Sequence, residues 1–284
     1  MSIKSKAFNF FQNIYTSIPK IIPGYLGKKF RAESAEKLVV IDEVKTKYGL
    51  LRYYCMGWLP IWRSKTLFTK EPETISWIDA MDKNDILWDI GSNVGLYSVY
   101  AGLKGMKVFA FEPSALNTFF ISKNIEINNL KDNVSLFPVA ISDRNEFGYL
   151  NMSSTDLGGA FNEFNETNLK TVGEDDYKKP IVFKQGMFAY SMDELIEKYK
   201  FETPGYIKID VDSIEDRIVY GGSKTLANKK VKGLLLELVE TEDRTQKIID
   251  FLAERGLTLK EKKHSELMSS GKFKNFFNYI FERI

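Results

Sequence analysis

The sequence is poor in the side chains that build disulfides and zinc sites. Its 284 residues include one cysteine, Cys55, and one histidine, His264. One cysteine cannot form a disulfide within the chain, and one cysteine with one histidine cannot build a Cys/His zinc site. His264 is the only histidine available to a mechanism, and its charged surroundings at 262–266 predict a surface position. The cysteine usage fits a reducing compartment, so we expect a cytoplasmic protein.

Long apolar runs are also missing. The longest runs, such as 108–111 and 233–236, are far shorter than the roughly 20 residues that a bilayer crossing needs. The start of the chain has no continuous apolar core followed by a small-residue cleavage site, so a secretory signal is not expected. With 44% apolar residues and a net charge of +2, the chain is expected to fold around a core, and its charge predicts no nucleic-acid partner.

Acidic residues are absent from the first 32 positions, which carry six lysines and arginines. Aromatic side chains alternate with these basic residues, at Phe8, Phe10, Phe11, Tyr15, Tyr25 and Phe30. A helix is expected at 7–15, before Pro19. One interpretation of residues 1–32 is a peripheral contact with a membrane or an acidic glycan. The other, commoner for basic helix faces, is an arm that docks on the domain with its charges in solvent.

The pattern of the remaining chain predicts an α/β fold. A hairpin is expected at 37–55, and a helix is expected to begin at Glu71-Pro72. Strands and helices then alternate, which is typical of a doubly wound, mostly parallel sheet covered on both faces. The strands are predicted at 86–90, 107–111, 134–141, 206–211 and 231–239, with an antiparallel pair at 257–262 and 276–281. A helix is predicted at 214–226. We expect a basic arm and hairpin extension at 1–70 and a ligand-binding domain at 71–284, with a long loop at 145–190.

The most informative stretch is the turn after the strand at 86–90. Residues 89–95 have the spacing Asp-x-Gly-x-Asn-x-Gly, which differs from the Gly-x-Gly-x-x-Gly of dinucleotide binders. A pyrophosphate prefers bare amides at a helix N-terminus, whereas an acid at a strand tip suits a cation such as the sulfonium of S-adenosylmethionine. The cofactor-binding candidates here are Asp89, Gly91, Ser92, Asn93 and Gly95. The alternative is an ordinary strand-to-helix turn.

Two further strand ends supply candidate cofactor ligands. Glu112 and Pro113 end the strand at 107–111, and a carboxylate there can accept hydrogen bonds from ribose hydroxyls. The alternative for Glu112 is an acidic helix cap. Ser142 and Asp143 follow the strand at 134–141 and are expected to accept from an adenine amine, although Ser-Asp pairs are also common in turns.

The strand at 206–211 is unusual because one of its faces is charged. Strict alternation places Lys208, Asp210 and Asp212 on one face, where a strand buried on both sides should be apolar. Unpaired buried charges cost several kcal/mol each, so these groups are expected to pair or to do chemistry at a strand tip. The alternative is an edge strand with a solvated face. Glu237 is a second polar residue in an apolar strand.

Together these motifs resemble the FkbM-type family of S-adenosylmethionine-dependent methyltransferases. The matching segments are 88–95, 109–113, 191–195, 206–212 and 278–281, and the resemblance covers roughly residues 70–283. It implies the class I, Rossmann-like methyltransferase fold, with seven strands and the last inserted antiparallel. It also implies O-methylation of a hydroxyl on a sugar, glycolipid, polysaccharide or secondary metabolite. The sequence departs from the family's Lys-Ile-Asp-Val-Glu-Gly at Asp212-Ser213, which puts the role of Asp212 in question.

The expected chemistry is direct displacement at the activated methyl group, for which the protein must align the acceptor oxygen and remove its proton. Asp210 is the first candidate base and Asp212 the second, and Lys208 is expected to orient or tune them. Asp210, Asp212 and Glu237 could meet around a divalent ion, but no metal is expected. Two alternatives stay open: a non-catalytic binding protein with the cofactor fold, and an NAD-dependent oxidoreductase.

Overall fold

The structure is a computed structural model that describes residues 3–17, 20–160, 162–165, 180–211, 214–240, 243–264 and 274–283. Its contacts divide the chain into two compact units, Met1–Ile41 and Asp42–Ile284. In the described ranges, no helix combines the length and apolar character that crossing a membrane requires.

The first unit consists mainly of two helices, α1 (Ile3–Ser17) and α2 (Gly24–Lys37). The predicted helix at 7–15 is confirmed and extends in both directions, whereas α2 was not predicted. All side chains from Lys6 to Ser17 are exposed. In α2, a Cβ atom added at Gly27 would lie 1.8 Å from the carbonyl oxygen of Ile22, so the turn before the helix needs glycine at this position.

The predicted hairpin is confirmed as β1 (Val40–Thr46) and β2 (Gly49–Cys55). Alternate residues of β2, Leu51, Tyr53 and Cys55, are buried in the same apolar cluster as α4 and α5 of the main domain. The side-chain amide oxygens of Asn128, the residue that follows α6, and of Asn124 within α6 accept hydrogen bonds from the backbone N–H groups of Arg52 and Tyr54 in β2, at 2.8 and 2.7 Å. The domain boundary at residue 70 stays a prediction, and these contacts favour assigning the hairpin to the main domain.

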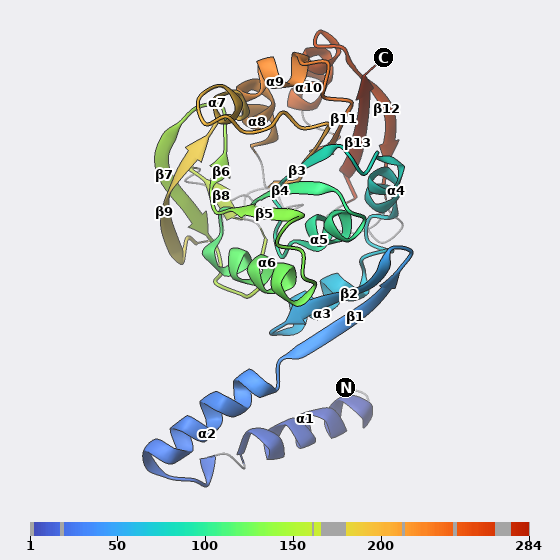
Figure 1. Cartoon of the computed structure of the whole chain (residues 1–284). Helices are drawn as coiled ribbons and strands as arrows, with labels where there is room; N and C mark the ends of the chain where they lie inside the picture. Colours follow the sequence, from blue (N-terminus) through green and yellow to red (C-terminus); the bar gives the residue numbers. More distant parts are fainter. Residues whose placement is uncertain are drawn as a thin grey trace. The chain divides into compact units, whose positions relative to one another are not determined.

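The main domain contains a seven-stranded sheet in the order β12-β13-β11-β10-β3-β4-β5 (Figure 1). β13 runs antiparallel to both of its neighbours, and the pairings among β11, β10, β3, β4 and β5 are parallel. This order confirms the predicted doubly wound, mostly parallel α/β fold. The strands are β3 (Ile86–Ile90), β4 (Lys107–Phe111), β5 (Val134–Phe137), β10 (Tyr206–Ile209), β11 (Gly233–Val239), β12 (Leu257–Lys263) and β13 (Phe276–Arg283).

Helices cover both faces of this sheet, with α4, α5 and α6 on one side and α7 to α10 on the other (Figure 1). Strand residues alternate between two apolar clusters, so that Leu87 packs toward α4 and α5 while Trp88 packs toward α7 and α8. The helices are α3 (Trp58–Lys65), α4 (Pro72–Ala80), α5 (Leu96–Leu103), α6 (Ala115–Ile127), α7 (Met192–Glu197), α8 (Glu215–Gly221), α9 (Ser223–Ala227) and α10 (Asp243–Ala253).

Two regions differ from the sequence prediction. The helix expected at 214–226 is split into α8 and α9 at Gly222, where a Cβ atom would lie 2.1 Å from Cε of Met192 in α7. The expected loop at 145–190 contains strands of a second, four-stranded sheet in the order β6-β9-β7-β8. Three of these strands, β7 (Glu146–Met152), β8 (Asn162–Phe164) and β9 (Phe183–Tyr190), lie in the expected loop. The fourth, β6 (Ala140–Ile141), is the end of the strand predicted at 134–141, which is divided between β5 of the main sheet and β6 of the second sheet.

Candidate active site

Four neighbouring strands bring one polar row together at the carboxyl end of the main sheet. The register aligns Phe111 of β4, Ile90 of β3, Ile209 of β10 and Leu236 of β11. The residues that follow these four positions form what we call the end row: Glu112, Gly91, Asp210 and Glu237. Ligands of doubly wound sheets bind outside the carboxyl ends of the strands. The end row therefore marks the expected binding edge.

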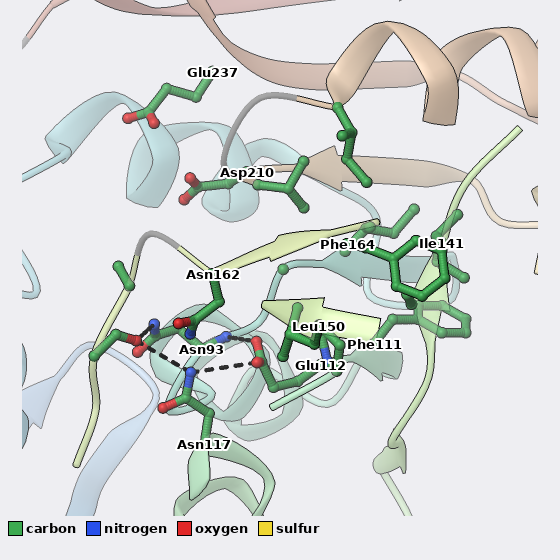
Figure 2. A pocket seen from close by; sticks show the side chains of 18 of the residues that line it. Asn93, Phe111, Glu112, Asn117, Ile141, Leu150, Asn162, Phe164, Asp210 and Glu237 are labelled. Carbon is green, nitrogen blue, oxygen red and sulfur yellow. Dashed lines mark hydrogen bonds between the residues drawn. The ribbon is translucent and has the colours of Figure 1, made fainter. Parts of the chain in front are cut away.

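A cavity of about 470 Å³ lies over the end row, within the range of about 300–1,000 Å³ that small-molecule sites occupy. Its lining is sorted by chemistry (Figure 2). One wall is polar, one is apolar, and the third carries charges. The polar wall includes Asn93, Glu112 and Asn117, the apolar wall includes Phe111, Ile141, Leu150 and Phe164, and the charged wall includes Lys70, Asp210 and Glu237.

The glycine turn has the tight geometry that its spacing predicts. Gly91 has a φ of +83°, and a Cβ atom there would lie 2.0 Å from the carbonyl oxygen of Asp210. Gly95 has a φ of +79°, and its Cβ would lie 3.2 Å from the Ile121 side chain of α6. Both positions favour glycine, Gly91 because β10 is so close and Gly95 because α6 packs against the turn.

Glu112 forms the centre of the polar wall. Its Oε2 accepts a hydrogen bond from the backbone N–H of Asn93 at 2.8 Å, and its Oε1 accepts from the N–H of Ser114 at 2.9 Å. The Nδ2 group of Asn117 donates to Oε1 at 3.3 Å and also to the carbonyl of Gly159 at 3.2 Å. The Glu112 carboxylate is thereby held in one orientation at the cavity wall.

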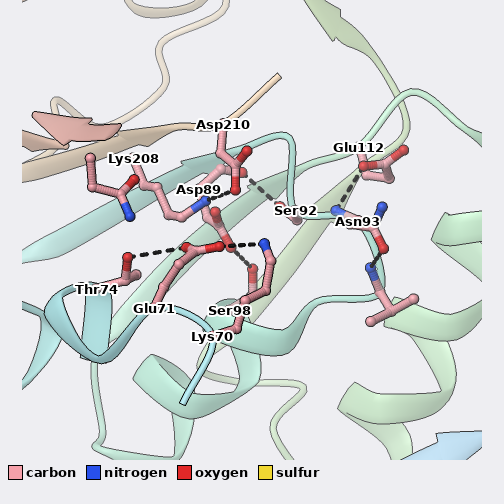
Figure 3. Close-up of polar contacts among 12 residues, drawn as sticks. Lys70, Glu71, Thr74, Asp89, Ser92, Asn93, Ser98, Glu112, Lys208 and Asp210 are labelled. Atoms are coloured by element: carbon pink, nitrogen blue, oxygen red, sulfur yellow. Dashed lines mark hydrogen bonds and ion pairs between the residues drawn. The ribbon is translucent and has the colours of Figure 1, made fainter. Parts of the chain in front are cut away.

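The charged wall depends on a buried lysine. Nζ of Lys208 donates to Oδ2 of Asp210 at 2.7 Å, and the Lys208 side chain is only 2% exposed (Figure 3). Burial alone would raise the pKa of Asp210, but the ammonium groups of Lys208 and Lys70 outweigh burial and hold this pKa at about 2. Lys70 forms an ion pair with Glu71. Lys208 lies behind the cavity and is not part of its lining.

The structure places two predicted cofactor ligands, Asp89 and Ser92, outside the cavity lining. Asp89 is buried and accepts a hydrogen bond from the hydroxyl of Ser98 in α5 (Figure 3). Its burial raises its pKa, against the opposing effect of Lys208. Ser92 donates to the carbonyl of Asp89 at 2.7 Å. Neither Asp89 nor Ser92 lines the cavity, whereas Gly91, Asn93, Glu112 and Pro113 do.

Ser142 and Asp143 also lie outside the cavity lining. Asp143 pairs with Arg217, which donates to Oδ1 from Nε at 3.0 Å and from Nη2 at 2.8 Å. Burial alone would raise the pKa of Asp143, but the hydrogen bonds from Arg217 and Ser142 lower it. The strand residues just before them, including Ile141, do line the cavity. Asp212, the second candidate base, falls outside the described residues.

Sequence reasoning missed several residues of this site. Asn117 is in the first turn of the helix after Glu112, and this position is the only signal that could have suggested it. Lys70 reaches the cavity from the segment before α4, and nothing in the sequence links it to the end row. In the described ranges, no group of His, Cys, Asp and Glu side chains is arranged to hold a metal ion. His264 lies outside the cavity, with its ring 4.5 Å from that of Phe277.

Comparisons with known proteins point to one family. A family profile described as "Methyltransferase FkbM domain" matches residues 89–259. The hexuronic acid methyltransferase AglP of Haloferax volcanii is 26% identical over 189 residues, which cover 66% of this chain and 70% of that protein.

Solved structures with a similar arrangement of elements include two methyltransferases. One is magnesium protoporphyrin IX methyltransferase of Synechocystis PCC 6803 with bound S-adenosylmethionine, at 11% identity and a TM-score of 0.46. The match covers 81% of this chain and 86% of that chain. The other is precorrin-6y C5,15-methyltransferase of Geobacter metallireducens, at 17% identity and a TM-score of 0.44. The match covers 77% of this chain and 90% of that chain.

We expect Lys208→Met to destabilise the fold by about 3–5 kcal/mol at neutral pH, because it leaves the Asp210 carboxylate partly buried without its partner. Lys224→Met is the matched control, since its ion pair with Glu197 is exposed and is worth about 1 kcal/mol or less. Urea unfolding of both variants measures the difference. Equal effects of the two substitutions would contradict the role of Lys208.

The same pair predicts a pH dependence. The pKa of Asp210 is about 2 in the folded protein and about 3.9 in an unfolded chain. Ionised Asp210 therefore stabilises the fold above about pH 4, and this contribution is lost as the pH falls toward 2. In Lys208→Met, the free energy of unfolding should therefore fall less between about pH 4 and pH 2 than it does in the wild type.

Proposed function

The chain belongs to the FkbM methyltransferase family, and on this premise we propose that it transfers the methyl group of S-adenosylmethionine to a hydroxyl oxygen of a sugar. The end row supports this proposal most directly. It places a firmly held carboxylate, Glu112, at one end of a single cavity and two acids, Asp210 and Glu237, at the other. A cofactor with a ribose and a cationic centre matches Glu112 and Asp210 in that order.

The residues present fit the cofactor. We assign Glu112 to the ribose hydroxyls and the apolar wall to the adenine, because each offers the chemistry that its part of the cofactor needs. Gly91 lets a ligand approach the backbone closely, and Asp210 provides negative charge toward a sulfonium. Asp89, Ser92 and Gly95 are assigned to shaping the turn. The adenine contact of Ser142 and Asp143 stays a prediction.

S-adenosylmethionine, when bound, supplies both the activated methyl group and the leaving group. The protein then has two tasks, which are to position the acceptor oxygen and to receive its proton. The charged wall is suited to both, because its carboxylates line the cavity two and three strands away from Glu112.

Two cations favour an acidic sugar as the acceptor. Arg63 and Lys70 line the cavity together with Asp210 and Glu237. Nε of Arg63 donates to the carbonyl of Gly158 at 3.1 Å, which fixes the guanidinium beside the cavity. A uronic acid carries a carboxylate that such cations attract, and the relative from Haloferax volcanii is described as a hexuronic acid methyltransferase. We therefore propose a uronic acid residue as the acceptor class.

We expect Glu112→Gln to weaken S-adenosylmethionine binding by about 10- to 100-fold, because hydrogen bonds to a charged group contribute about 1.5–3 kcal/mol. Isothermal titration calorimetry on the full chain measures the affinity, and Glu254→Gln, an exposed glutamate, is the control. Unchanged affinity in Glu112→Gln would refute the ribose assignment. Tight binding of NAD in place of S-adenosylmethionine would favour the oxidoreductase alternative.

Acceptor choice is tested by transfer of a radiolabelled methyl group to pairs of glycosides that differ only in a C6 carboxylate or hydroxymethyl group. We expect the uronides to be methylated at least about tenfold faster, which corresponds to one charge-assisted hydrogen bond of about 1.4 kcal/mol. A preference for the neutral sugars would exclude the acidic acceptor. Binding of S-adenosylmethionine without transfer to any member would favour the non-catalytic alternative.

We also propose that α1 and α2 attach the protein to an anionic membrane surface. Phe10, Phe11 and Ile14 lie on one face of α1 by their helical spacing, and all three are exposed. In α2, Tyr25, Leu26 and Phe30 are exposed as well. The chain up to residue 32 has six basic residues and no acidic one. The second half of α2 carries Glu33 and Glu36. Apolar side chains beside lysines are typical of helices that lie in the interface of anionic bilayers.

Sedimentation with lipid vesicles tests this attachment. The full chain should pellet with vesicles that contain about a third phosphatidylglycerol, less with pure phosphatidylcholine, and less again when salt rises. Replacing Phe10, Phe11 and Ile14 by serine should abolish pelleting. The control replaces Phe147 and Phe188, exposed aromatic residues of the second sheet, by serine and should pellet like the wild type. Equal pelleting of both variants, or self-association without lipid, would contradict the membrane proposal.

A further inference from the structure

Glu237 occupies the outermost position of the end row. Ile209 of β10 pairs with Leu236 of β11, so the next residues, Asp210 and Glu237, follow side by side on neighbouring strands. Strands are about 4.8 Å apart. Counted from Glu112, Asp210 is therefore about 10 Å away along the row and Glu237 about 14 Å. Of the two acids, Glu237 is farther from the proposed ribose site.

The two acids also differ in how they are bonded. Asp210 accepts a 2.7 Å hydrogen bond from Lys208, which occupies its Oδ2 atom. Glu237 lines the same cavity (Figure 2). Within the part of the chain that the structure describes, no hydrogen bond or ion pair joins the side chain of Glu237 to another residue. Both carboxylate oxygens of Glu237 are therefore open to a ligand, whereas one oxygen of Asp210 is already engaged.

We propose that Glu237 is the general base that receives the proton of the acceptor hydroxyl, and that Asp210 acts as a fixed negative charge beside it. This inference rests on the proposed methyl transfer. The acceptor oxygen loses its proton to a carboxylate oxygen of Glu237 as it gains the methyl carbon. The electron pair of the broken carbon–sulfur bond stays on sulfur, so charge and atoms balance without a further reactant.

The charges around Glu237 support this division of roles. Burial raises the pKa of Glu237 well above its usual range, and the Asp210 carboxylate raises it further. Glu71 acts in the same direction, while Lys70 and Lys208 oppose it. Asp210 is held in its ionised form by its lysines. A base accepts a proton most effectively when its pKa is near the working pH, and two acids with separated pKa values are typical of divided acid–base roles.

Carbon-13 NMR of the full chain, labelled at glutamate side-chain carboxyls, tests the inference without any acceptor. The signal that disappears in Glu237→Gln is that of Glu237. It should titrate at clearly higher pH than the exposed glutamates, and Asp210→Asn should move its titration downward by removing the neighbouring charge. The control Glu254→Gln should leave it in place. Glu237 titrating together with the exposed glutamates, or unmoved by Asp210→Asn, would overturn the assignment.

Cofactor binding separates this inference from the proposed function. Glu237→Gln should bind S-adenosylmethionine within about threefold of the wild type, yet transfer methyl groups to uronides about 100-fold more slowly or worse, the usual contribution of a general base. Transfer by Glu237→Gln at the wild-type rate would show that Glu237 is not the base. Failure of the wild type itself to bind S-adenosylmethionine would instead count against the proposed function.

Discussion

The ammonium group of Lys208 is buried on a central strand, and the charged wall of the cavity depends on it. A lysine with 2% of its side chain exposed is tolerable only among carboxylates. Asp210 provides the direct contact at 2.7 Å, and Asp89 and Glu71 add charge that, together with Asp210, outweighs burial and raises the pKa of Lys208. This balance of charge allows Asp210 to stay ionised beside the cavity. It also accounts for the polar face of a strand that should otherwise be apolar.

Much of the fold was predictable because its signals are local. The alternation of strands and helices, the glycine turn and the charged face of β10 are all readable from neighbouring residues. The second sheet was not, because its strands pair across a segment rich in turn-forming residues and join positions that are far apart in the chain, such as Leu150 and Gln185. The break between α8 and α9 depends on the approach of Met192, which is a contact between distant parts of the chain.

Prediction from local sequence signals also fails for single residues of the candidate site. Periodicity gives the face on which a side chain lies, but not whether that face borders a cavity. Asp89 and Lys208 pair in register and lie on the α5 side, behind the cavity. Asp210 follows the last residue of β10 and lines the cavity. Asn117 and Lys70 belong to separate elements that the tertiary fold brings to the cavity, so no spacing rule could have found both.

The contact between Gly91 and the Asp210 carbonyl has an evolutionary consequence. A Cβ atom at position 91 would lie 2.0 Å from that oxygen, so a side chain there would push β3 and β10 apart. Descendants of this chain that retain the strand spacing must therefore retain glycine at 91. Sequence change that alters acceptor choice is then free to accumulate in α3, whose side chains border the cavity without separating the central strands.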